Sequence, residues 1–221
     1  HLKLEHQCVM NQLGIGIPMA LQFSITAVGT ILVQAALNTF GSVAVAAYTA
    51  ACKVEQLVTQ PYSAMGMTMA TYSAQNRGIN DLNRIRKGTR IANYISAAYS
   101  VVVYGVIIVL LPYLIQLFVG NEVTEVLGYA RIYIYVCGSC FIPLGMIFIF
   151  RNVLQGAGFA LLPMLGGVVE LLCRSVAAYG AVKLNSFTGV CMANAGTWLV
   201  TGIFLAVAYL FIIRKLEASL R

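Results

Sequence analysis

Charged side chains are scarce in this sequence. Only 10% of the 221 residues are Asp, Glu, Lys or Arg, whereas 60% are hydrophobic. A soluble domain of this length needs far more polar surface, because its outside faces water. The few charges also cluster, and the tracts between them are long enough to cross a bilayer, for which roughly 18 apolar residues suffice. Composition therefore excludes a soluble globular protein and predicts an all-α membrane protein.

The signatures of soluble enzymes are missing as well. The two histidines, His1 and His6, both stand at the start of the chain, and no cluster of His, Cys and carboxylates suggests a metal or catalytic centre. Gln155-Gly-Ala-Gly158 lacks the lysine of a phosphate-binding loop and indicates a tight turn between helices. Cys137-Gly-Ser-Cys140 has redox spacing, but no acid or histidine stands near it to activate a thiolate. We therefore expect no enzyme activity and no cofactor.

Lysine and arginine outnumber the acids, and the net charge is +7. In membrane proteins such an excess marks the loops on the cytoplasmic side. The alternation of basic and basic-free loops predicts six spans in a cell membrane with both chain ends in the cytoplasm. Because this pattern explains the positive net charge, we expect no nucleic-acid partner. Basic residues gather at 75–90, at Arg151 and at 214–221, the turns 38–42 and 120–125 have none, and only Lys183 departs from the pattern.

Six apolar tracts, separated by helix-breaking residues, divide the chain. Residues 1–12 have the mixed character of the end of a linker, and the absence of an initiator Met at His1 leads us to expect a piece of a longer protein. A six-transmembrane-helix bundle is the predicted fold. Its spans cover about 13–37, 43–72, 91–119, 126–150, 160–182 and 189–213, followed by a basic tail at 214–221.

Polar residues inside a membrane span are costly and therefore imply a role. Lys53 stands eleven residues after Ser42, about 16 Å along a helix. That is close to the middle of a hydrocarbon core about 30 Å thick. Gln56 and Gln60 follow on the same face. We predict that this face lines a water-filled substrate cavity; the alternative is a buried structural ion pair.

Further polar residues allow two interpretations. Glu55 is two residues from Lys53 and points to nearly the opposite side, so it lines the cavity or pairs with another helix. Glu170 and Arg174 stand at i and i+4 and are predicted to form a structural ion pair, while Arg151 is predicted to be interfacial. The polar stripe of the first span, which faces the cavity or bonds to neighbouring helices, consists of Gln22, Ser24, Thr26, Gln34 and Asn38.

Four stretches together resemble the multidrug and toxic compound extrusion (MATE) family. They fall in family order and at family spacing, and they cover essentially all of 13–213. Leu13–Pro18 is similar to the entry of the family's seventh helix, Asn38–Tyr48 to the turn into the eighth, and Gln75-Asn-Arg-Gly78 to the end of that helix. Arg151–Gly158, with Pro163 after it, resembles the turn between the tenth and eleventh helices.

The resemblance implies the C-terminal lobe of a twelve-helix, two-lobe transporter. Such proteins exchange H⁺ or Na⁺ for organic, often cationic drugs by alternating access, so the implied partners are small-molecule drugs, the lipid bilayer and a missing N-terminal six-helix lobe. The acids of the family's sodium-coupled branch are replaced here by Thr26 and roughly Leu144. This departure favours the branch related to the DNA-damage-inducible transporters, in which the site of the coupling ion lies in the N-terminal lobe.

Other functions stay open from the sequence. A lipid-linked sugar flippase of the same superfamily is one, although the four stretches argue against it. A non-transporting or dimerising half-size membrane module is another, and the sequence upstream of His1 would decide that question. A membrane thiol enzyme built on Cys137 and Cys140 is the third.

Overall fold

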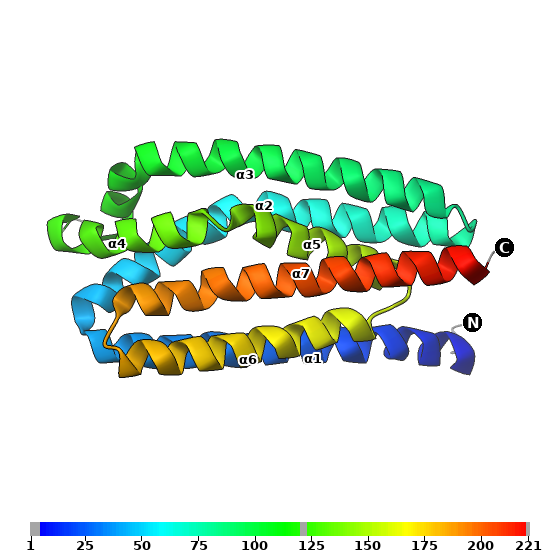
Figure 1. The fold of residues 1–221 in the computed structure, drawn as a ribbon, viewed down its shortest axis with the longest axis horizontal. Coiled ribbons are helices and arrows are strands. Elements are labelled where there is room, and N and C mark those ends of the chain that lie inside the picture. Colours follow the sequence, from blue (N-terminus) through cyan, green and yellow to red (C-terminus); the bar gives the residue numbers. More distant parts are fainter. Residues whose placement is uncertain (1–4, 120–122, 220–221) are drawn as a thin grey trace.

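The computed structural model describes residues 5–119 and 123–219, and this part of the chain is helical apart from short turns. The long helices run side by side along the longest axis of the molecule (Figure 1). The all-α fold class predicted from the sequence is therefore confirmed. The elements are α1 (His6–Leu37), the 3₁₀ turn η1 (Asn38–Phe40), α2 (Ser42–Gly78), α3 (Leu82–Val119), α4 (Val123–Gly138), α5 (Phe141–Gly156), α6 (Leu161–Lys183) and α7 (Phe187–Ser219).

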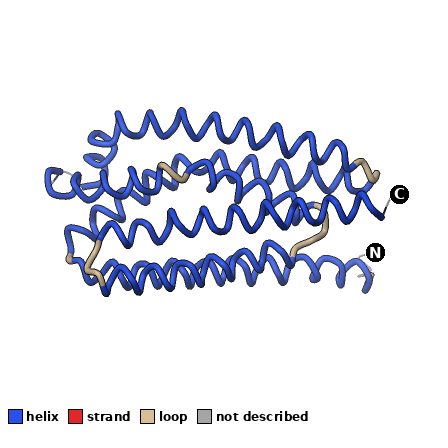
Figure 2. The backbone as a smooth tube through the Cα atoms, in the orientation of Figure 1, coloured by secondary structure: helices blue, strands red, loops and turns tan. Residues whose placement is uncertain are grey.

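The chain reverses at the two ends of the bundle. The start of α1, the end of α7, the α2–α3 turn and the α5–α6 link lie at one end, and η1 and the α6–α7 turn lie at the other (Figures 1 and 2). Gly41 and Gly158 stand in two of these turns with φ of 90° and 91°. Glycine adopts such angles without the clash that a Cβ would cause. These glycines let the chain turn back within a few residues.

Several helices are long and apolar enough to cross a membrane. In the described residues α1, α3, α6 and α7 meet this condition singly, and α4 with α5 meets it as one bent span. The remaining long helix, α2, is as long as these helices but carries Lys53 and Glu55. The membrane limits predicted from the sequence stay predictions, because helix ends do not mark them: α1 already begins at His6, inside the stretch expected to be linker.

The fourth predicted span, about 126–150, corresponds to two helices that together are long and apolar enough to cross a membrane. It is broken between α4 and α5, whose axes differ by 51°. Pro143 explains the break, because proline has no N–H to offer the carbonyl of Ser139 one turn earlier. The Cys140 N–H instead bonds to the Cys137 carbonyl at 3.0 Å, and the Ser139 hydroxyl donates to the Val136 carbonyl at 2.7 Å.

Two packing zones build the lobe. α1 packs chiefly on α6 and α6 on α7, while α2 packs on α3, α4 and α5. The helices approach closely where small residues meet, as expected in a membrane: a Cβ on Gly156 would lie 2.1 Å from the carbonyl oxygen of Ala70. Large apolar side chains cover the outside of the bundle, which is the surface that lipid requires. Examples are Val109, Leu117, Val176, Ile203 and Phe211.

Candidate functional site

A polar cavity of about 320 Å³ opens between five helices. This volume is at the small end of the range for small-molecule sites. The residues that α2 contributes are Tyr48, Thr49, Cys52, Lys53, Glu55 and Gln56. The remaining lining residues are Thr30 and Gln34 of α1, Tyr133 of α4, Arg174 of α6, and Asn194 and Trp198 of α7.

The residues predicted to line a cavity divide into two groups. Lys53, Glu55, Gln56 and Gln34 line the one described above. Lys53 and Glu55 both line it although they stand two residues apart on α2. Gln60 stands outside it on the exposed face of α2, where its amide donates to the Gln56 carbonyl at 3.2 Å. Their binding of a substrate stays a prediction.

The carboxyl group of Glu55 is held by a tyrosine. The Tyr133 hydroxyl donates to Glu55 Oε2 and accepts a hydrogen bond from the Cys52 thiol at 3.2 Å. The Tyr133 ring packs edge-on against Tyr48 with ring centroids 4.8 Å apart. Asn194 Nδ2 in turn donates to the Tyr48 hydroxyl at 2.8 Å. These contacts fix the acid between α2, α4 and α7.

Sequence reasoning missed Tyr48, Tyr133 and Asn194. A signal existed for Asn194, which is an isolated amide in the apolar tract of the last span and stands four residues before the tract's tryptophan, Trp198. The two tyrosines gave no signal, because aromatic residues occur throughout the spans. Their position beside Glu55 depends on how three helices pack, and no local pattern encodes it.

Arg174 is a buried cation that bonds only to neutral groups. Arg174 is only 8% exposed. Its Nη1 donates to Thr30 Oγ1 at 3.2 Å and to the Thr26 carbonyl at 3.4 Å. Its Nε is buried without a hydrogen-bond partner. The side chain passes over Gly29, where an added Cβ would lie 3.3 Å from the Arg174 Cδ.

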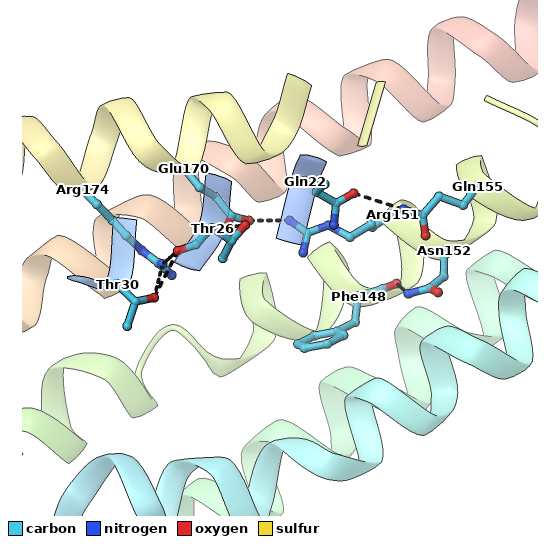
Figure 3. Close-up of polar contacts among 9 residues, drawn as sticks. All are labelled: Gln22, Thr26, Thr30, Phe148, Arg151, Asn152, Gln155, Glu170 and Arg174. Atoms are coloured by element: carbon cyan, nitrogen blue, oxygen red, sulfur yellow. Dashed lines mark hydrogen bonds and ion pairs between the residues drawn. The ribbon is translucent and has the colours of Figure 1, made fainter. Parts of the chain in front are cut away.

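A second polar cluster ties α1, α5 and α6 together (Figure 3). Arg151 Nη2 donates to Glu170 Oε1, and the two side chains are only 14% and 5% exposed. The Thr26 hydroxyl donates to Glu170 Oε2 at 3.3 Å. Beside them, Gln155 Nε2 donates to Gln22 Oε1 at 3.0 Å, and both of these residues are buried. Gln22 and Thr26 therefore serve contacts between helices in this structure.

The predicted partner of Glu170 is wrong. The ion pair joins Glu170 to Arg151, and Arg174 reaches α1 instead. Side chains on a helix lean toward its N-terminus, which is the direction in which Arg151 lies from Glu170 (Figure 3). Arg151, which was predicted to be interfacial, points into the lobe from α5 and bonds to Glu170 (Figure 3). Its depth in the membrane stays a prediction.

Neither cluster offers a metal site. Over the described ranges 5–119 and 123–219, no group of three or more His, Cys, Asp or Glu side chains could hold a metal ion. The cysteines there are free, and the buried Cys137 thiol lies 3.6 Å from the carbonyl oxygen of Cys191. The arrangement is suited to binding a polar group in the cavity.

Comparison with protein families gives a match over most of the chain. The model of the MatE family matches residues 18–180. The probable multidrug resistance protein YoeA of Bacillus subtilis is 25% identical over 111 residues, which is 50% of this chain and 23% of that protein. The chain thus matches only part of its longer curated relative.

Solved structures match the whole lobe. A MOP superfamily transporter from Pyrococcus furiosus, described as having a binding pocket of reverse polarity, aligns with a TM-score of 0.90 at 16% identity, over 97% of this chain and 49% of that chain. The MATE transporter VcmN of Vibrio cholerae, in its bent form, aligns with a TM-score of 0.86 at 18% identity, over 98% and 49%. The chain spans about half the length of these structures and has the fold of that half.

Proposed function

This chain belongs to the MatE family, and on that premise we propose that it is the C-terminal lobe of a secondary transporter that exports organic compounds in exchange for H⁺ or Na⁺. The family consists of membrane transporters and not of enzymes. The observation that carries the proposal is the polar cavity inside a lobe whose outside is apolar. Such a cavity gives a solute polar partners at membrane depth, where lipid offers none.

The C-terminal position is supported by the order of the four family-like stretches along the chain. The branch is supported by Thr26 and Leu144, which stand where the sodium-coupled branch has acids. Thr26 donates its hydroxyl to Glu170, whose charge is neutralised by Arg151, and Leu144 is buried in the apolar core. This neighbourhood does not favour a free cation, so we place the coupling site in the N-terminal lobe.

The orientation follows from the distribution of basic residues. The turn between α2 and α3 and the last turns of α7 lie at the same end of the bundle (Figure 1). This end carries Arg77, Arg84, Arg86, Lys87, Arg214 and Lys215. An excess of Lys and Arg marks the cytoplasmic side, so both chain ends are assigned to the cytoplasm and the η1 end to the outside.

The exposed face of α2 is assigned to the space between the lobes. Lys53, Gln56 and Gln60 are all exposed there, and Lys53 has no hydrogen-bond or ion-pair partner among the described residues. Hydrocarbon would leave these groups unsatisfied at a cost of several kcal/mol each, on the order of the penalty for unpaired polar groups in lipid. Water, substrate or the N-terminal lobe can satisfy them.

The test is transport by the complete two-lobe protein in proteoliposomes. We expect a fluorescent organic dye to move against its gradient when a pH or Na⁺ gradient is imposed, and to stop when an ionophore removes that gradient. Dye movement that ignores both gradients would contradict the proposal, as would flipping of a lipid-linked sugar in place of dye transport.

A further inference from the structure

The charges that line the cavity do not cancel. Two cations, Lys53 and Arg174, share it with one carboxyl group, that of Glu55. The cavity is thus net positive whether Glu55 is ionised or carries a proton. Neither cation forms an ion pair with Glu55: the described part of the chain has its ion pairs at Arg86–Glu217 and Arg151–Glu170.

Arg174 is the strongest indication that the cavity binds an anion. A buried guanidinium is costly unless a counter-charge and full hydrogen bonding compensate it. Here its acceptors are a hydroxyl and a carbonyl, and its Nε has none. The one other carboxylate nearby, that of Glu170, already accepts from Arg151 and Thr26 through its two oxygens. Arg174 therefore keeps donor capacity for an incoming group.

The shape of the guanidinium indicates which group that is. Its planar set of donors matches a carboxylate or phosphate, with two parallel hydrogen bonds. Lys53 adds a second, exposed ammonium from the α2 side of the same cavity. A lipophilic cation would meet net repulsion here, whereas an anionic group would find two opposite charges.

We propose that this cavity binds the carboxylate of an amphipathic organic compound between Arg174 and Lys53. The transporter then selects zwitterionic or anionic compounds over simple lipophilic cations. The inference rests on the proposed transport function, of which it specifies the substrate class. It departs from the sequence-based expectation of cationic drugs, which came from the family resemblance and not from these residues.

Two dyes that differ only in one carboxyl group provide the experiment. Rhodamine B has a free carboxylate, and its ethyl ester has the same cationic ring system without it. We would measure the Kd of each for the complete transporter in phosphatidylcholine nanodiscs by fluorescence anisotropy. The variants are Lys53→Gln and Arg174→Gln, with Arg131→Gln as the control, because Arg131 is an exposed arginine of α4 outside the cavity.

We expect the acid to bind more tightly than the ester. Each cavity variant should weaken acid binding about tenfold or more, as expected for a lost hydrogen bond to a charged group. The same variants should not weaken ester binding, and they should tighten it to the extent that a repelling cation has been removed. Arg131→Gln should change neither. Lys53→Gln keeps the test decisive if Arg174→Gln fails to fold, because Lys53 is exposed and holds no partner in the described chain.

Equal or tighter binding of the ester, or acid binding that Lys53→Gln leaves unchanged, would overturn the inference. The proposed function would survive that result if the ester is still transported with the ion gradient, so the two can fail separately. An arm with phosphatidylglycerol in the nanodiscs identifies the source of the anion. If this lipid weakens acid binding to the parent protein by a larger factor than it weakens acid binding to Lys53→Gln, a lipid phosphate competes for the site, which supports an anion site.

Discussion

Removing Glu170 should destabilise the lobe more than removing the whole ion pair. Glu170→Leu leaves the guanidinium of Arg151 without its carboxylate, and the Nε of that arginine already lacks a partner. Loss of one member of a buried pair costs about 3–5 kcal/mol, whereas apolar replacement of both is often close to neutral. No large discount for solvent screening applies, because the two side chains are 14% and 5% exposed.

The assay is the thermal stability of the complete transporter in detergent, followed by fluorescence-detected size exclusion. Glu170→Leu should melt well below the parent, and Glu170→Leu with Arg151→Met should recover most of the loss. Glu170→Leu with Arg174→Met should not recover it, because Arg174 bonds to α1 and not to Glu170. Recovery by the Arg174 variant in place of the Arg151 variant would refute the assigned pairing. A single variant that keeps full stability and loses only transport would move the pair into the transport path.

Three further predictions concern topology, the α2 face and helix packing. In a cysteine-free background, a membrane-impermeant thiol reagent added outside should label Asn185→Cys and miss Asn80→Cys; the opposite pattern contradicts the orientation. Gln56→Cys should react with a water-soluble thiol reagent in the assembled transporter, and lack of reaction in every conformational state would remove α2 from the cavity. Gly156→Ala should lower stability by about 1–3 kcal/mol through overpacking against the α2 backbone, whereas Gly180→Ala, with open space around its Cβ, should be neutral or stabilising; equal effects in thermal melts would contradict the close approach.

Features set by local composition could be predicted from the sequence. The apolar tracts gave an all-helical membrane fold, and breaker residues such as Gly41 gave turns where the structure has them. Lys53 was expected to line a cavity because a charged side chain at that depth needs water or polar partners. In the structure Lys53 lines the polar cavity. The bend of the fourth span had a signal in Pro143, which the length of the apolar tract concealed.

The partners of polar groups could not be predicted in this way. The i, i+4 spacing of Glu170 and Arg174 is compatible with an ion pair. In the structure, however, Glu170 pairs with Arg151 from another helix. The partner of Glu55 also comes from another helix, because Tyr133 of α4 donates a hydrogen bond to its carboxyl group. Such contacts depend on helix positions in three dimensions, and a helical spacing rule describes only one helix at a time.

The break between α4 and α5 determines where the guanidinium of Arg151 lies. From Cys140 to Arg151 a helix advances roughly 16 Å, so a 51° change of direction displaces its far end by about 13 Å from a straight continuation of α4. That is farther than an arginine side chain can reach. A straight fourth span would leave Glu170 without a counter-ion and would carry Arg151 to a different neighbour. The turn at Ser139 and Cys140, followed by Pro143, thus determines which acid Arg151 can reach and neutralise.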